Sequence, residues 1–554
     1  MSRSPVTSSF ARSLLAGTRR RGGHSSSAAL GERHERSLRS SHAPIAAAVI
    51  AMGVAACSSD ADDSPAEDGP APVIVWDQCP PLAQGAPSRD PGQTCGTLKV
   101  PLDYTDPGGA TIELAVSRIA SARPGQRRGV LLLNPGGPAL PGLDTPSAMA
   151  PTLPQSVLDR YDLIGFDPRG VEHSTAQSCG LGDGSLSGFF PYPAADGSIT
   201  RNVDLATTTA AQCASVAGST LQYFTTANTA RDLDRIRRAL GEDKVSYWGQ
   251  SYGTYLGAVY SALFQDRTDR VILEGNVDPT KVWSGHLATQ GKGMAERFPD
   301  AAAVAAAQSD ALGLGATVAE VTSTYLALAD RLDRQPAPLP GTALSLTGPL
   351  LRNVTYALLL HNETLPVLVQ FWKAAADLAD EQLDEADAAV LQQVLADSPS
   401  SPGIPADNQL TVALALLCGD VSWSRDVDEY AARTAEDRAT WPLTAGMPAN
   451  ILPCAFWQYP PIEAPVSVGD TGTRNILILQ NRRDHATPWE SAVGLRHSLG
   501  SRAAFVGVDN GGHYVYDAGS RCADQATINL LADGVLPEAD LDCSDVSQRD
   551  AGAR

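Results

Sequence analysis

The feature that most constrains this chain is the pentapeptide GQSYG at residues 249–253, together with the segments on either side of it. An apolar run over residues 245–248 precedes it, and a helical pattern, TYLGAVYSALF, follows it. G-x-S-x-G between a strand and a helix is typical of a nucleophile elbow, a sharp turn that holds a serine hydroxyl above the edge of a sheet. The glycines are needed because a Cβ at either position would clash with neighbouring backbone. We therefore predict that Ser251 is a nucleophile and not a serine of an ordinary surface turn.

Further short apolar runs, alternating with helical patterns, predict the fold class. They are residues 129–133, 162–166, 271–273, 476–479 and 504–508. Several of them end in turn-forming sequences, such as NPGGP at 134–138. Apolar strands that alternate with helices indicate an α/β fold with a mostly parallel sheet covered by helices on both faces.

Between residues 281 and 466 the pattern changes to Ala-rich and Leu-rich helical periods, with no strand–turn–helix unit. We interpret this segment as a large helical cap, or lid, inserted before the strand that precedes Asp484. Residues 76–280 and 467–543 are then the two parts of the core, and residues 544–554 form a tail.

A serine nucleophile needs a base, and the base needs an acid that orients it. In folds with this elbow the acid precedes the histidine along the chain. His513 is the predicted base because it follows the last strand on a Gly-rich loop, whereas His497 lies in a helical pattern and His485 directly follows Asp484. Asp484, just past the strand at 476–479, is the predicted acid, and Asp509 is its rival.

The oxyanion of an acyl-transfer reaction needs two backbone N–H donors. One is expected from Tyr252, the residue after the nucleophile, and the other from the turn at 134–138. Pro138 has no N–H, so Gly136 or Gly137 is the predicted second donor, and the sequence leaves both open.

Nine cysteines are present, and eight of them follow residue 57. An even number in an exported protein implies disulfides, and pairing between neighbours closes the smallest loops. The chain has no C-x-x-C, and its histidines do not cluster with cysteines, so we expect neither a metal nor a cofactor. The predicted pairs are Cys79 with Cys95, Cys179 with Cys213, Cys418 with Cys454, and Cys522 with Cys543.

The N-terminal region has the features of an export signal. Arginines at 33, 36 and 39 precede an apolar stretch at 43–54, which ends in Val-Ala-Ala-Cys at Cys57. This resembles a bacterial lipobox, and the alternative is an ordinary secretory signal. We predict a signal region over residues 1–56, lipidation of Cys57 and a flexible acidic tether over 57–75. The protein is then exported, and contacts a membrane surface only through its lipid anchor.

The formal net charge of −20 bears on possible partners. A chain this acidic is repelled by phosphate backbones, which excludes nucleic-acid binding. No apolar run reaches the length of about 20 residues that spans a bilayer.

Taken together, NPGGP, FDPRG, GQSYGTYLG, NRRDHATPWESA and a GGH followed by two cysteines resemble the secreted tripeptidyl aminopeptidase branch of the α/β-hydrolases. The resemblance covers roughly residues 76–543 and includes Cys418-Gly419-Asp420. It implies a serine peptidase that acts on peptides with a free N-terminus, with Ser251, Asp484 and His513 as its triad. One difference is Glu274-Gly275, where the family usually has Asp-Gly.

Two alternatives come from other classes. A serine esterase or lipase would use the same triad on acyl esters, and a surface lipoprotein could bind a ligand without catalysis. A peptidase that recognises a free N-terminus needs a carboxylate for the substrate ammonium, because an unpaired buried charge is costly. Its candidates are Glu274, Asp278, Glu296 and Glu363.

Overall fold

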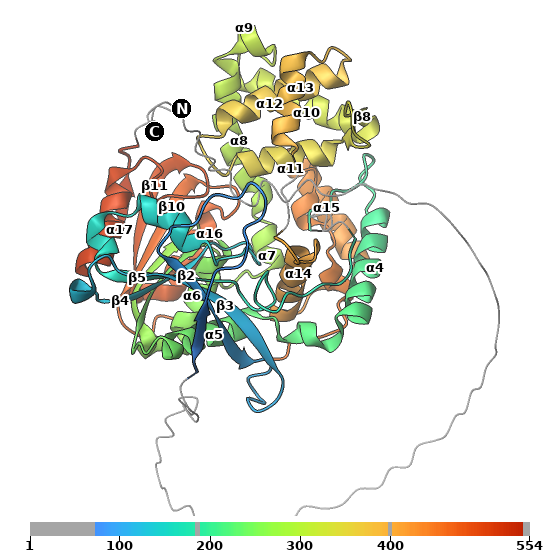
Figure 1. Cartoon of the computed structure of the whole chain (residues 1–554). Coiled ribbons are helices and arrows are strands. Elements are labelled where there is room, and N and C mark those ends of the chain that lie inside the picture. Colours follow the sequence, from blue (N-terminus) through green and yellow to red (C-terminus); the bar gives the residue numbers. More distant parts are fainter. Residues whose placement is uncertain (1–71, 183–188, 397–400, 547–554) are drawn as a thin grey trace, which may run out of the picture. The chain divides into compact units, whose positions relative to one another are not determined.

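A computed structural model describes residues 72–182, 189–396 and 401–546 of the chain (Figure 1). Its main sheet has ten strands in the order β1-β2-β3-β5-β4-β6-β7-β10-β11-β12. Pairing from β5 through β12 is parallel, and β1, β2 and β3 join the edge beside β5 in antiparallel register. The predicted α/β class with a mostly parallel sheet is confirmed. The strands are β1 (Ile74–Asp77), β2 (Gln93–Pro101), β3 (Thr111–Ile119), β4 (Gly129–Asn134), β5 (Tyr161–Phe166), β6 (Val245–Gln250), β7 (Thr268–Glu274), β10 (Ile476–Arg483), β11 (Ala503–Gly511) and β12 (Leu541–Cys543).

Alternating apolar side chains explain why the sheet is covered on both faces. In β4, Val130 and Leu132 belong to one buried cluster, and Leu131 and Leu133 to another. Helices α5, α6 and α16 pack in the first cluster, and α3 and α17 in the second. Since successive strand residues point to opposite faces, a continuous apolar run is what a two-sided core requires. The helices of this part are α2 (Thr145–Met149), α3 (Gln155–Leu158), α4 (Thr200–Val216), α5 (Thr226–Ala239), α6 (Tyr252–Leu263), α16 (Trp489–Leu499) and α17 (Arg521–Asp533).

The chain between β7 and β10 is mainly helical, and its helices divide into two groups (Figure 1). Helices α8 and α10–α13 enclose a core of their own, built around Phe298, Tyr325 and Trp372. Helix α14 instead packs in the main core, through Leu410 and Leu414. A two-stranded hairpin, β8 (Ala337–Pro338) and β9 (Ser345–Leu346), interrupts the helices. The helices are α7 (Ser284–Leu287), α8 (Gln290–Ala306), α9 (Ser309–Leu312), α10 (Val318–Arg334), α11 (Gly348–Leu358), α12 (Leu365–Ala379), α13 (Glu385–Val394), α14 (Asn408–Asp420) and α15 (Val427–Thr440).

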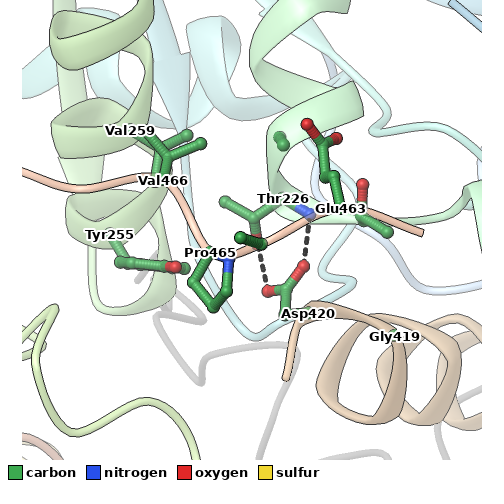
Figure 2. A pocket seen from close by; sticks show the side chains of 11 residues that line it. Thr226, Tyr255, Val259, Gly419, Asp420, Glu463, Pro465 and Val466 are labelled. Atoms are coloured by element: carbon green, nitrogen blue, oxygen red, sulfur yellow. Dashed lines mark hydrogen bonds between the residues drawn. The ribbon is translucent and has the colours of Figure 1, made fainter. Parts of the chain in front are cut away.

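A buried carboxylate joins α14 to the main core. Asp420, the last residue of α14, accepts hydrogen bonds from Thr226 N (2.8 Å) and Thr226 Oγ1 (2.6 Å) at the start of α5, as Figure 2 shows. It also accepts one from Trp283 Nε1 at 3.1 Å. Burial raises the pKa of Asp420 to about 6, against the lowering effect of these hydrogen bonds. The contact therefore ties three segments that are far apart in sequence to one acceptor.

Four disulfides form within the described residues, and all four pairs predicted from the sequence are confirmed. Each joins two cysteines that are neighbours along the chain, with a sequence separation of at most 36. Their Cα atoms lie 4.4 to 5.8 Å apart, within the range that a disulfide spans. The bridges are Cys79–Cys95, Cys179–Cys213, Cys418–Cys454 and Cys522–Cys543.

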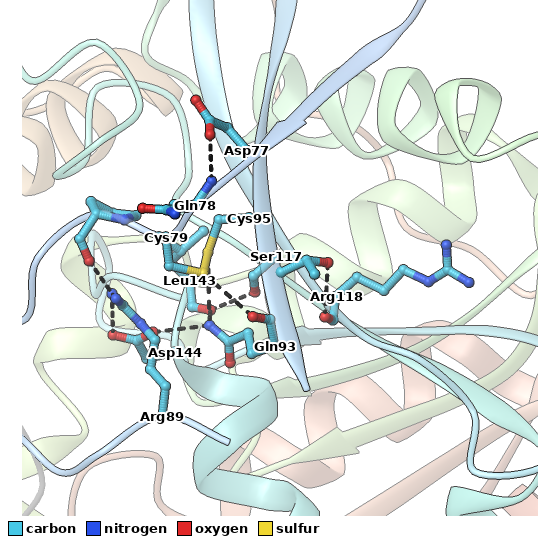
Figure 3. Close-up of a disulfide and its surroundings, with 12 residues drawn as sticks. Asp77, Gln78, Cys79, Arg89, Gln93, Cys95, Ser117, Arg118, Leu143 and Asp144 are labelled. Atoms are coloured by element: carbon cyan, nitrogen blue, oxygen red, sulfur yellow. Dashed lines mark hydrogen bonds and ion pairs between the residues drawn. A yellow bond between two sulfur atoms is a disulfide. The ribbon is translucent and has the colours of Figure 1, made fainter. Parts of the chain in front are cut away.

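The first of these bridges lies beside the loop that follows β4 (Figure 3). There Gln93 Nε2 donates to Leu143 O at 3.1 Å, and Arg89 forms an ion pair with Asp144. The antiparallel edge of the sheet thus braces the loop that begins with the NPGGP turn.

None of the helices in the described part of the chain combines the length and the apolarity that crossing a membrane requires. The predicted signal region, Cys57 and most of the predicted tether lie outside the described residues. Short 3₁₀ segments complete the connections: η2 (Pro124–Gln126), η3 (Ala150–Thr152), η5 (Gly218–Tyr223), η6 (Gln265–Arg267), η7 (Met447–Ala449), η8 (Pro453–Phe456) and η9 (Gly500–Arg502).

Candidate active site

The turn between β6 and α6 has the geometry of a nucleophile elbow. Ser251 adopts φ 57° and ψ −124°, and a positive φ is rare for a residue other than glycine. Its N–H donates to Glu274 O at 2.9 Å, and its carbonyl accepts from Thr254 N at 2.8 Å. A strained residue held by hydrogen bonds on both sides indicates a functional turn.

The two glycines of the pentapeptide allow the turn to close. A Cβ on Gly249 would lie 2.2 Å from Gly253 O, and one on Gly253 would lie 2.6 Å from Asn134 Oδ1. Either contact is far inside van der Waals distance, so only glycine fits. The reason given for these glycines from the sequence therefore holds in the structure.

His513 and Asp484 form a buried pair at the carboxyl ends of β11 and β10. His513 Nδ1 lies 2.8 Å from Asp484 Oδ2. The carboxylate also accepts from Thr487 Oγ1 at 2.7 Å and from the backbone N–H groups of Ala486 and Thr487 at 2.9 and 3.0 Å. Burial raises the pKa of Asp484, but the charge of His513 and these hydrogen bonds outweigh it and hold that pKa below its usual value. Asp484 is therefore ionised at neutral pH and orients the imidazole.

The rival residues lie elsewhere. Asp509 pairs with Arg483 Nη1 at 2.9 Å on the exposed side of the strands. His485 is buried, its Nε2 lies 2.8 Å from Tyr356 O, and burial lowers its pKa to about 3. His497 is exposed on α16. Of these candidates, the structure brings only Asp484 to His513.

Two backbone N–H groups lie next to the elbow. Tyr252 N is the first amide of α6, where helical N–H groups lack an intrahelical acceptor. Gly136 approaches so closely that a Cβ there would lie 2.8 Å from Ser251 Cβ, but its own N–H already donates to Asn134 Oδ1 at 3.1 Å. Gly137 lines the pocket beside Ser251, and its N–H meets no acceptor among the described residues. Gly137 is thus the better placed of the two predicted donors.

Glu274 has a structural task that the sequence did not reveal. Its Oε1 accepts from Val515 N (2.6 Å) and Tyr516 N (2.7 Å), in the loop that follows His513. Its Oε2 accepts from Trp248 Nε1 and Gln250 Nε2 at 3.0 and 2.9 Å. Glu274 is buried and lies outside the pocket wall, so its suggested role as partner of a substrate ammonium is not supported.

Two other candidates for that role are engaged elsewhere. Asp278 is buried, and its Oδ1 accepts from Thr280 N and Thr280 Oγ1 at 2.9 and 2.7 Å. Glu296, on α8, lies 3.7 Å from the ammonium of Lys292. Neither carboxylate belongs to the wall of the pocket that contains Ser251, and the fourth candidate, Glu363, does not belong to it either.

The residue after Glu274 explains why the strand β7 ends in Glu-Gly. A Cβ on Gly275 would lie 2.9 Å from His513 Cε1, so a glycine is needed to let the imidazole approach the strand. Its φ of +66° is also a conformation that favours glycine.

A pocket enclosing about 730 Å³, part of it open to solvent, contains both Ser251 and His513 in its wall. The NPGGP turn lines one side of it, and the segment between β7 and β10 supplies much of the remainder. Most of the wall is apolar or aromatic, a composition typical of small-molecule sites. The lining residues from that segment are Val277, Trp283, His286, Leu287, Gln290, Tyr356, Leu360 and Leu417.

Comparison with known proteins agrees with this geometry. A family model described as the alpha/beta hydrolase fold matches residues 129–520. The tripeptidyl aminopeptidase of Streptomyces lividans is 33% identical over 464 residues, covering 81% of this chain and 83% of that protein. Serine protease Hip1 of Mycobacterium tuberculosis is 30% identical over 464 residues, covering 82% and 87%. Carboxylesterase B of the same organism is 32% identical over 491 residues, covering 86% and 90%.

The family model spans β4 to β11, including the elbow and the helical segment between β7 and β10. Two of these three relatives are named as peptidases, and all three are at least 30% identical to this chain over the aligned residues. The chain belongs to the α/β-hydrolase fold family and, within it, is a serine peptidase related to the tripeptidyl aminopeptidase of S. lividans and to Hip1.

Proposed function

We propose that Ser251, His513 and Asp484 are the catalytic triad of this serine peptidase. The observation that carries the proposal is the 2.8 Å contact between His513 Nδ1 and Asp484 Oδ2, made by a histidine that shares a pocket wall with Ser251. With Nδ1 bound to the carboxylate, Nε2 is the nitrogen left to accept the serine proton.

The reaction then proceeds by acyl transfer. Ser251 Oγ attacks the substrate carbonyl carbon while its proton passes to His513 Nε2. The oxyanion that forms is bound by the N–H groups of Tyr252 and Gly137. The proton next passes to the leaving amine nitrogen, the C–N bond breaks, and the acyl-enzyme remains. Water, deprotonated by His513, releases the acid and restores Ser251.

We further propose that the enzyme removes short units, of tripeptide length, from the free N-terminus of peptides. The name of the Streptomyces relative supports this. The segment over residues 281–466 acts here as a cap that closes one end of the cleft.

We propose Glu363 as the partner of the substrate ammonium. Its Oε1 lies 3.4 Å from His361 Nδ1, and the His361 ring stacks on Tyr514, which lines the pocket. Burial raises the pKa of Glu363, but the hydrogen bond and charge of His361 outweigh it, so the carboxyl is ionised at neutral pH. Its side chain remains 57% exposed and accessible to a ligand.

A second candidate function is hydrolysis of carboxylic esters. One relative is named a carboxylesterase, and no carboxylate of the described residues lines the pocket itself. A wall without a carboxylate can bind an uncharged acyl group, because such a substrate carries no ammonium that needs a charged partner.

The experiment that separates the two uses one peptide sequence in free and N-acetylated forms, with mass spectrometry of the products. We expect release of an N-terminal tripeptide from the free form, and kcat/KM at least about 10-fold lower for the acetylated form. Glu363→Gln should reduce this difference, while Glu296→Gln, which changes a carboxylate of α8 that lies beside the ammonium of Lys292, should not. Equal cleavage of both forms would contradict the aminopeptidase proposal, and cleavage of esters alone would support the esterase.

We also propose that the protein is exported and anchored through lipidated Cys57. Four disulfides support an oxidising compartment. The apolar stretch at 43–54 that ends at Cys57 supports the anchor.

A further inference from the structure

One polar side chain in the pocket has no role in the mechanism above. His286, on the short helix α7, lines the same pocket as Ser251 and is only 7% exposed. Its backbone is engaged, because its N–H donates to Lys281 O at 2.7 Å and its carbonyl accepts from Thr289 Oγ1 at 2.7 Å. Neither ring nitrogen hydrogen-bonds to any residue that the structure describes, and Nδ1 is buried without a partner.

An unpaired imidazole in an apolar wall is costly. Burying a polar atom without a hydrogen bond destabilises the folded state, and native structures leave few such atoms unexplained. Two neighbouring donors of the wall are engaged within the protein: Gln290 Nε2 donates to Ala486 O at 3.2 Å, and Trp283 Nε1 donates to Asp420. The ring nitrogens of His286, by contrast, remain available to a ligand.

The imidazole is uncharged at neutral pH. Burial lowers the pKa of His286 to about 4, although Asp484 and Asp278 act in the opposite direction. A neutral imidazole offers one N–H donor and one acceptor nitrogen. That pair suits an amide, which carries a donor and an acceptor of its own, better than it suits a carboxylate or an ammonium.

We propose that His286 is a specificity-determining residue that hydrogen-bonds an amide of the bound acyl group, so that the pocket prefers peptidyl acyl groups to plain hydrocarbon ones. This deepens the proposed peptidase function and rests on it. Apolar side chains of the substrate then contact the aromatic wall, while the amide that accompanies them binds to the imidazole. A site built for such a hydrogen bond discriminates strongly against an analogue that lacks it.

The test compares two p-nitrophenyl esters that differ only in the amide. One is the ester of N-acetylphenylalanine, and the other is the ester of 3-phenylpropanoic acid, which lacks the acetamido group. The quantity measured is the ratio of their kcat/KM values for the wild type, His286→Leu and His286→Gln. His497→Leu is the matched control, because that histidine is exposed on α16. Circular dichroism and thermal unfolding check that each variant is folded.

We expect the wild type to favour the amide-bearing ester, and His286→Leu to reduce this ratio about 10-fold. His286→Gln, which keeps a donor and an acceptor, should restore part of the ratio, and His497→Leu should leave it unchanged. An unchanged ratio in His286→Leu, or an equal loss on both esters, would overturn the proposal, since a merely structural role lowers both alike. Because both probes are esters, failure to cleave peptides would contradict the proposed function and leave this test intact.

Discussion

In the proposed triad, one buried carboxylate orients the base. Asp484 accepts four hydrogen bonds besides the contact with His513, and they come from Gln480, Ala486 and Thr487. A carboxylate held so firmly fixes the imidazole in one tautomer, with its other nitrogen directed away from the acid.

Substitution of Asp484 should lower kcat far more than substitution of its rival, Asp509. Asp484→Asn leaves the shape of the site intact but no longer favours the Nδ1–H tautomer, and we expect kcat to fall about 10³- to 10⁴-fold. Asp509→Asn should change kcat by only a small factor, because Asp509 pairs with Arg483 at the surface. Steady-state kinetics on one peptide substrate measures both, and a larger loss in Asp509→Asn would show that the acid is misassigned.

At this scale, prediction from sequence depended on local patterns. The elbow could be predicted because its glycines and flanking elements are contiguous in sequence. The structural role of Glu274 could not be predicted in this way. The groups that donate hydrogen bonds to its carboxylate come from β6 and from the loop after β11, which are distant along the chain. The choice between Gly136 and Gly137 needed the contact with Asn134, a detail of turn geometry that no composition encodes.

Among the elements, α14 shows how inserted helices are fixed to the sheet domain. From the sequence, all helices over residues 281–466 were assigned to one cap. In the structure, α14 packs in the main core, and its last residue, Asp420, accepts a hydrogen bond from the first residue of α5. The edge strands β1–β3 were also absent from the prediction. A usable signal existed for β3, where Ile112, Leu114 and Val116 occupy alternate positions and are all buried.

The stability that the buried Asp420 contributes to the fold should depend on pH. Because burial raises its pKa to about 6, the folded protein binds a proton there more tightly than the unfolded chain does. The stabilisation from this proton is complete below the unfolded pKa of about 4 and is lost as pH rises through the folded value.

The measurement is chemical unfolding between about pH 4 and pH 7 for the wild type and Asp420→Asn. The free energy of unfolding of the wild type, relative to the variant, should fall by roughly 1–3 kcal/mol as pH rises. Asp310→Asn, the same change at an exposed aspartate of α9, serves as the control. A difference between wild type and Asp420→Asn that is constant over this range would contradict a titrating Asp420.

For the molecule as a whole, four disulfides suit a protein that works in an oxidising compartment. Each disulfide closes a short stretch of chain, and the sequence predicted the pairs because local closure costs least entropy. Thus Cys213 could be assigned to Cys179, and Cys454 to Cys418, from their order along the chain alone. The order of strands along the sheet could not be deduced in this way, since it depends on contacts between segments that are far apart.

The proposed anchor gives a prediction at this scale. Cys57→Ser should move the expressed protein from the membrane fraction to the soluble exported fraction, because acyl chains are added to the cysteine thiol and amine. Immunoblots of both fractions check this, with Cys79→Ser as the control for loss of a cysteine. A Cys57→Ser protein that remains with the membranes would rule out lipidation at this residue.

The central claim is that Ser251 is activated by its neighbours to attack a carbonyl carbon. The most direct measurement is labelling of the intact protein with a fluorophosphonate, followed by mass spectrometry of the modified peptide. The account predicts a single adduct on Ser251, its absence in Ser251→Ala, and much slower labelling in Asp484→Asn and His513→Ala. An adduct on another residue, or equally fast labelling without His513, would contradict it.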